Sequence, residues 1–172
     1  FPSISLGWRI TEESFMKEQK IFNDIKLRAG YGVTGSQPNE SFLGKSMLGY
    51  GDYYLYDGKW VKALQPTQNA NPELKWEEKH EWDIGVDFSM LDFRINGSID
   101  WYNRQIKGLL YDYTVPSPPN LYTTTRANVG TMSNTGLEVM LNVIPIKNNN
   151  MQWSSTVTFS TNKNKLKSLS ND

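Results

Sequence analysis

The chain contains 172 residues, with 18 basic and 18 acidic side chains and no cysteine. A net charge of zero gives no electrostatic argument for nucleic-acid binding or for attraction to an anionic membrane surface. The lack of thiols excludes disulfide scaffolds and thiolate metal sites. No apolar run approaches the roughly 20 residues that a membrane-spanning helix requires, so we expect any membrane crossing to use strands.

Six segments alternate apolar and polar residues with a period of two, the pattern of a strand with one apolar and one polar face. They cover residues 3–10, 25–34, 79–91, 94–106, 136–146 and 152–162. We therefore predict an all-β fold, in which six strands form one antiparallel meander. In a membrane barrel the apolar set points away from the barrel axis, and it includes Leu6, Leu27, Val86, Ile99, Leu141 and Val157. The polar set, with Asp87, Asp100 and Glu138, would then face the lumen.

The connectors between these segments alternate between a short side and a long side. A tight turn around Asp92 and the run 147–150 join neighbouring segments, and the first connector, 11–24, belongs to the same side by strand parity. The loops Ser36 to Glu78 and Lys107 to Asn134 belong to the other side. Outer-membrane barrels show this asymmetry, with short periplasmic turns and long extracellular loops. We predict a transmembrane barrel in which both long loops lie together on the extracellular rim.

Six strands are too few to close around a polar lumen, because the smallest membrane barrels have about eight strands and an open edge is not tolerated in lipid. We therefore interpret residues 1–172 as about six strands of a larger barrel, without a terminal strand. The chain opens on Phe1, Pro2 and Ser3, without a basic and apolar signal segment.

The long loops are rich in aromatic residues. Flat rings interleaved with short polar groups can stack on sugars or peptides, although tyrosines in a loop can also pack against one another. The candidate residues for contact with a ligand or a lid are Tyr53, Tyr54, Tyr56, Trp60, Tyr111 and Tyr113.

Three other motifs are better explained by a barrel strand than by chemistry. Residues 30–35 match the dinucleotide fingerprint G-x-G-x-x-G, but no helix follows to receive a pyrophosphate. His80, the only histidine, has acidic neighbours that alternation divides between two faces. Asp83, Asp87 and Asp100 only hint at a glycosidase carboxylate pair, and a water-filled lumen explains them equally well. We predict a protein that is not an enzyme, with no catalytic residue, metal or cofactor.

Several motifs together resemble the SusC/RagA family of TonB-dependent outer-membrane transporters, in the order in which that family carries them. They are FPSISLGWR at 1–9, IKLRAGYGVTG at 25–35, NPELKWE at 71–77, GVDF at 85–88, GSIDWYN at 97–103, NVG at 128–130, GLE at 136–138 and NKNK at 162–165. The resemblance covers nearly the whole chain and corresponds to a late part of the barrel.

The resemblance implies a barrel of about 22 strands in the bacterial outer membrane, whose lumen is plugged by a folded domain. It also implies uptake of an oligosaccharide or peptide substrate, powered through TonB and assisted by a SusD-like surface lipoprotein that acts as a lid. The partners are therefore this lipoprotein, the substrate, outer-membrane lipid and TonB through a plug region that this sequence lacks. A soluble β-sandwich that binds carbohydrate through the same aromatic loops stays open as the alternative. In a sandwich the apolar face would meet a second sheet, whereas in a barrel it meets lipid.

Overall fold

The computed structural model describes residues 1–38 and 40–169. Two compact units can be distinguished by their internal contacts. Unit 1 comprises Phe1–Thr34, Lys79–Ile106 and Met132–Leu166, and unit 2 comprises Gly35–Glu78, Lys107–Thr131 and Lys167–Asp172. Among the described residues, no helix is long and apolar enough to cross a membrane.

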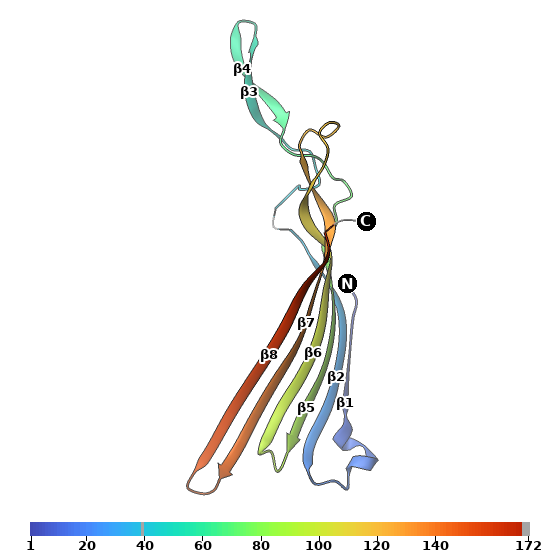
Figure 1. Cartoon of the computed structure of the whole chain (residues 1–172), viewed down its shortest axis with the longest axis vertical. Helices are drawn as coiled ribbons and strands as arrows, with labels where there is room; N and C mark the ends of the chain where they lie inside the picture. Colours follow the sequence, from blue (N-terminus) through green and yellow to red (C-terminus); the bar gives the residue numbers. More distant parts are fainter. Residues whose placement is uncertain (39, 170–172) are drawn as a thin grey trace. The chain divides into compact units, whose positions relative to one another are not determined.

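Six strands form one sheet in the order β1-β2-β5-β6-β7-β8, so each strand pairs with its neighbour in this series (Figure 1). Their bounds are β1 Ser3–Arg9, β2 Phe22–Ser36, β5 Glu77–Met90, β6 Ile95–Thr114, β7 Thr124–Lys147 and β8 Gln152–Ser168. All six predicted segments are strands, and the predicted single meander is confirmed. Two short 3₁₀ helices, Ile10–Glu12 and Ser14–Met16, lie in the connector between β1 and β2.

The register of β1 and β2 shows how alternation gives the sheet two different faces. Ile4 is paired with Tyr31, and Leu6 is paired with Ala29 in the same antiparallel ladder. Directly opposed residues point to the same side, so the apolar sets of the two strands share one face. Leu6 is 70% exposed and Val157, on β8, is 62% exposed. The apolar face of unit 1 is therefore uncovered.

A hydrophobic core between two layers is missing from the described part of the chain. Val129 is the one buried hydrophobic side chain among the described residues. A β-sandwich would bury the apolar faces of two sheets against each other, and the sandwich alternative is therefore wrong. An uncovered apolar face is instead what a barrel wall presents to lipid.

The predicted turn around Asp92 is confirmed, and its backbone is unusual. Leu91, Asp92 and Phe93 have φ angles of 54°, 55° and 60°, in the left-handed region that non-glycine residues rarely adopt. The neighbouring connector holds this turn, because the Leu91 amide donates to the Ile21 carbonyl and the Phe93 amide donates to Asn23 Oδ1. These bonds compensate for part of the strain.

The two long loops contain more regular structure than the sequence predicted. Residues 36–78 include a two-stranded sheet, β3 Leu48–Tyr56 with β4 Lys59–Pro66. In the second loop, β6 continues to Thr114 and β7 begins at Thr124, so 115–123 alone connects them. Alternation of apolar and polar residues marks a strand only where its faces differ in environment. Strands that lack such a difference are held by their backbone hydrogen bonds and carry no such pattern.

Candidate functional site

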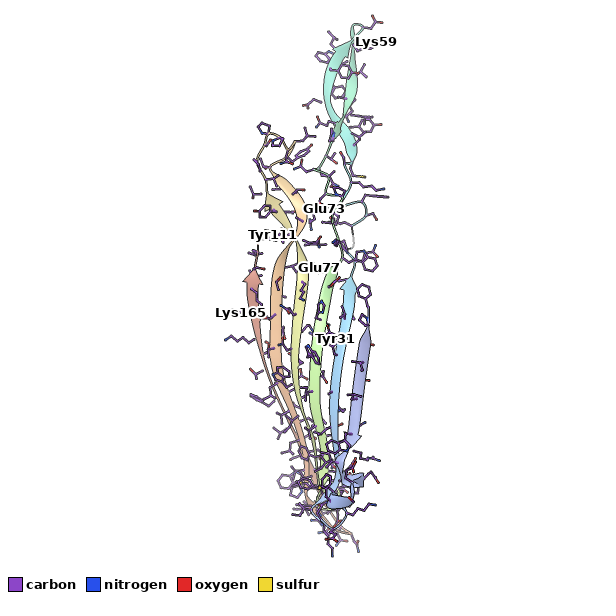
Figure 2. The ribbon with its side chains drawn as sticks, turned by 90° about the vertical axis from the view of Figure 1, so that its right-hand side faces the viewer. Tyr31, Lys59, Glu73, Glu77, Tyr111 and Lys165 are labelled. Carbon is purple, nitrogen blue, oxygen red and sulfur yellow. The ribbon has the colours of Figure 1, made fainter. Side chains whose placement is uncertain are left out.

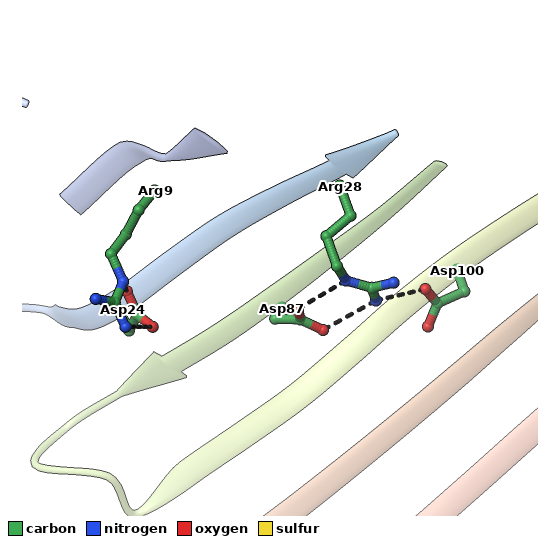
Figure 3. Close-up of polar contacts among 5 residues, drawn as sticks. All are labelled: Arg9, Asp24, Arg28, Asp87 and Asp100. Atoms are coloured by element: carbon green, nitrogen blue, oxygen red, sulfur yellow. Dashed lines mark hydrogen bonds and ion pairs between the residues drawn. The ribbon is translucent and has the colours of Figure 1, made fainter. Parts of the chain in front are cut away.

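The polar face of the sheet in unit 1 carries a three-residue ion cluster (Figure 3). Arg28 on β2 donates through Nε and Nη2 to Asp87 of β5, at 2.7 and 3.0 Å. The same Nη2 donates to Asp100 Oδ1 of β6 at 2.6 Å. A planar guanidinium suits this paired geometry better than an ammonium does. One side chain thus links three neighbouring strands.

Gly85 of β5 provides the space for this cluster. A Cβ atom at this position would meet Asp100 Oδ1 and would lie 2.7 Å from Arg28 Nη2. Any larger residue at Gly85 would therefore have to displace the groups that form the ion pairs. The motif GVDF, which contains both Gly85 and Asp87, is explained by this packing.

A second ion cluster lies on the same polar face. Arg104 of β6 donates to both carboxylate oxygens of Glu81 at 3.1 and 2.7 Å, and Lys79 Nζ lies 3.0 Å from Glu81 Oε2. The Arg104 guanidinium also lies 5.5 Å from the centre of the Tyr102 ring. These charges are partly exposed, as charges that line an aqueous lumen would be.

The ion clusters give Asp87 and Asp100 a structural role in place of a catalytic one. A glycosidase needs two carboxylates that face a sugar from opposite sides. Here both carboxylates bind a single guanidinium on one sheet surface. Among the described residues, no group of three acidic, histidine or cysteine side chains is placed to hold a metal ion.

The only histidine lies on the opposite, apolar face. The Tyr31 hydroxyl is 2.9 Å from His80 Nδ1, and the Tyr31 ring lies 4.6 Å from the ring of Trp82. Aromatic groups with a polar end favour the interface between lipid and water. This cluster matches the aromatic girdle of a membrane barrel.

In unit 2, the candidate aromatic residues of the first long loop lie on the β3–β4 hairpin. Its turn consists of Asp57 and Gly58, with φ angles of 50° and 71°. Two successive positive φ angles define the type I′ turn, which matches the twist of the flanking strands. Asp-Gly is a strong sequence signal for this turn, and the sequence analysis missed it because it treated Ser36 to Glu78 as one loop.

The pairing of β3 with β4 distributes these aromatic side chains over two faces. Tyr54 pairs with Val61 and Tyr56 with Lys59, whereas Tyr53 pairs with Lys62 and Leu55 with Trp60. We call the first set the tyrosine face, defined by Tyr54 and Tyr56, whose ring centres are 6.5 Å apart. The second set is the lysine face, defined by Tyr53, Trp60 and Lys62.

The lysine face also includes Tyr50, because the Lys62 ammonium lies 5.1 Å from the centre of the Tyr50 ring and 5.8 Å from that of Tyr53. Both faces of the hairpin are open, with Trp60 70% and Tyr56 67% exposed. An isolated hairpin is marginally stable in water. Exposed rings on both of its faces are typical of an element that contacts a partner.

Tyr111 and Tyr113 lie near the end of β6 and are also exposed. All six candidate residues are therefore accessible. The structure groups four of them on one hairpin and divides these four between its two faces. Among the described residues, no ring contact joins the hairpin to Tyr111 or Tyr113.

Three amide side chains, which the sequence analysis did not single out, link the two long loops within unit 2, and a fourth stabilises the first of these loops. Asn69 Nδ2 donates to the carbonyls of Tyr122 and Thr124, and Asn69 Oδ1 accepts from the Tyr122 amide. Asn128 makes a similar set of bonds, since it donates to the Lys75 carbonyl and accepts from the Lys75 amide.

The other two amides extend this amide clamp, which comprises Gln68, Asn69, Asn71 and Asn128. Asn71 donates to the Arg126 carbonyl in the second loop, whereas Gln68 donates to the carbonyls of Phe42 and Lys45 within the first loop. The prediction that the two long loops lie together is therefore confirmed. The signal was present in the motifs NPELKWE and NVG, which supply Asn71 and Asn128.

A pocket of about 640 Å³ opens beside this clamp in unit 2. Its lining includes Phe42, Lys45, Leu74 and Trp76, and the Lys45 ammonium lies 5.7 Å from the centre of the Phe42 ring. Polar residues also line this pocket, among them Glu40 and a second lysine, Lys75. A pocket with such a mixed lining can accept a group that has both apolar and polar parts. Sequence analysis did not find this pocket, because residues 37–45 and 71–76 carry no pattern that links them.

Comparison with known proteins places these features in a family. The whole chain, residues 1–172, matches a family described as TonB dependent receptor-like, beta-barrel. Two curated relatives are TonB-dependent receptor P39 of Formosa agariphila, 36% identical over 172 residues, and TonB-dependent receptor SusC of Bacteroides thetaiotaomicron, 33% identical over 174 residues. The matches cover 100% and 98% of this chain, but only 16% and 17% of those proteins.

Solved structures show the same fold. The RagAB peptide importer in its open-open state matches 95% of this chain with a TM-score of 0.85 and 22% identity, and the match covers 17% of that chain. Another structure of the RagAB peptide transporter matches 98% of this chain with a TM-score of 0.82. The chain thus spans about a sixth of the length of the proteins it resembles.

Proposed function

We propose that this chain, which belongs to the TonB-dependent receptor-like β-barrel family, serves in active import of a nutrient across the bacterial outer membrane. It supplies part of the barrel wall and the extracellular loops. The observation that carries the proposal is the sheet of unit 1, with an uncovered apolar face and an opposite face that holds two ion clusters. Such a sheet can separate lipid from an aqueous lumen.

The substrate that we propose is a glycan or a peptide. One relative is named SusC, and the structural neighbours are titled as peptide transporters, so the names of the relatives support import more than catalysis. The two aromatic faces of the hairpin suit flat sugar rings and peptide side chains alike. A SusD-like surface lipoprotein is the proposed lid, and TonB is the proposed source of energy through a plug region outside this chain.

Import can be tested in cells that carry the full-length protein. We expect uptake of labelled oligosaccharide or peptide pools that exceeds uptake by cells without the protein. Deletion of TonB should reduce this uptake to the background level while the barrel remains assembled in the outer membrane. Equal uptake with and without TonB would contradict active import.

Variants of the β3–β4 hairpin can show which aromatic residues serve this function. Because the tyrosine face and the lysine face point in opposite directions, two double variants separate them: Tyr54→Ala with Tyr56→Ala, and Tyr53→Ala with Trp60→Ala. We expect at least one double variant to weaken binding of substrate or lid about fivefold or more, as is usual for an exposed aromatic anchor.

Each double variant is the control for the other, since both remove two rings from the same element. Binding is measured with the full-length transporter by calorimetry for the substrate and by co-purification for the lid. Folded barrel yield should stay unchanged in both. Unaltered substrate binding and unaltered lid association in both double variants would show that these rings only pack within the loop.

A further inference from the structure

We propose that Lys163 and Lys165 of β8 form a binding site for phosphate groups of anionic lipid headgroups in the outer leaflet of the membrane. The inference rests on the barrel fold and is independent of the transported substrate. Both lysines belong to the motif NKNK at 162–165, which neither the lumen nor the aromatic loops explain.

The first step concerns the face of the sheet to which the lysines belong. The Asn164 side chain accepts a hydrogen bond from Asn134 Nδ2 of β7, which ties this residue to its neighbouring strand. Alternation places Lys163 and Lys165 on the face opposite Asn164, together with Val157 and Phe159. Figure 2 shows the Lys165 side chain extending away from the ribbon of β8.

The second step concerns depth in the membrane. β8 begins at Gln152, close to the short turn, and Trp153 is its second residue. The nine residues from 154 to 162 carry no charged side chain. A tilted strand crosses the apolar layer in about 9–11 residues, so a strand that enters at Trp153 leaves the layer near Lys163. The aromatic residue and the first lysine therefore mark the two interfaces.

The third step concerns what remains uncovered in the complete barrel. Further strands pair with β8 along its edge and leave its outward face free. Lys163 and Lys165 are both exposed, and neither forms an ion pair or hydrogen bond through its ammonium with the described part of the chain. Two ammonium groups at a lipid interface match the charge of headgroup phosphates. Acidic residues elsewhere in the chain balance the charge of these lysines. The net charge of zero therefore gives no sign of this site.

Outward lysines near a membrane interface can also serve only to extend their ammonium groups from the apolar layer into water. That role would require positive charge without any preference for a phosphate. The distinguishing property is therefore the dependence of lipid binding on the number of phosphates, on the lysines and on salt concentration.

The test uses the purified full-length protein, freed of lipid in a neutral detergent. The dissociation constant for lipid A with two phosphates is measured by native mass spectrometry and compared with that for the monophosphorylated form. Loss of one lysine near a charged surface raises the dissociation constant about fivefold. The double variant Lys163→Gln with Lys165→Gln should therefore weaken binding about 30-fold. It should also remove most of the preference for the second phosphate.

The matched control is Lys20→Gln with Lys147→Gln, which removes the same charge near the short turns. This variant should bind lipid A as the unaltered protein does, and Lys163→Arg with Lys165→Arg should retain binding. Equal losses in the control, or a retained preference in the Lys163 and Lys165 variant, would overturn the proposal. Loss of lid association with unchanged lipid binding would also overturn it, since the site would then serve a protein partner.

Discussion

At the scale of single residues, the ion cluster of Arg28, Asp87 and Asp100 makes the clearest prediction. Replacement of Arg28 by Met leaves two neighbouring carboxylates without their shared cation. We expect the free energy of unfolding to fall by about 1–2 kcal/mol, more than for a fully exposed pair and less than for a buried one. The measurement is the temperature at which the full-length barrel loses its folded mobility in a detergent gel.

The same cluster provides an internal control. Addition of Asp87→Asn to the Arg28→Met variant removes the repulsion between the carboxylates and should restore part of the lost stability. Asp87→Asn could instead lower the stability of the Arg28→Met variant by as much as it lowers that of the unaltered protein. The three residues would then not act as one cluster.

At the scale of elements, the β3–β4 hairpin depends on its turn. Gly58 has a φ angle of 71°, and no atom lies within 4 Å of a Cβ atom placed there. Replacement by Val would therefore cost stability through backbone strain alone, about 1–2 kcal/mol. Because an isolated hairpin is marginal, we expect Gly58→Val to unfold residues 48–66 and leave the six-stranded sheet intact.

Limited proteolysis of the full-length protein measures this outcome, and cleavage between Leu48 and Pro66 should become faster in Gly58→Val. Gly58→Asn is the matched control, since asparagine tolerates positive φ angles better than other non-glycine residues do. Equal cleavage rates for Val, Asn and Gly at this position would mean that the turn does not determine the stability of the hairpin.

At the scale of the whole molecule, the two faces of the sheet predict opposite effects of the same substitution. Val86 belongs to the apolar face of β5, and Ser89 belongs to the polar face. Val86→Arg places a charge in lipid at a cost of roughly 2–4 kcal/mol at mid-depth and should sharply reduce the folded fraction in bilayers. Ser89→Arg faces water and should fold nearly as the unaltered protein does. Equal folded fractions would show that Val86 does not face lipid.

Much of this architecture could be predicted from the sequence alone. The period-two pattern located all six strands of the sheet, because their two faces meet different environments. The contrast between short turns and long connectors predicted the grouping of the long loops. The predicted exposure of the candidate aromatic residues is also observed, although they lie on strands and not in loops. They are Tyr53, Tyr54, Tyr56, Trp60, Tyr111 and Tyr113.

Other features were decided only by the tertiary structure. The division of the aromatic residues into a tyrosine face and a lysine face depends on the register of β3 and β4, which includes a bulge between Tyr50 and Tyr53. The link from Arg28 to Asp87 and Asp100 joins residues 59 and 72 positions apart. Local patterning reports the environment of a strand face, because solvent and lipid act on each residue separately. It cannot report which distant side chains meet, because strand register decides that.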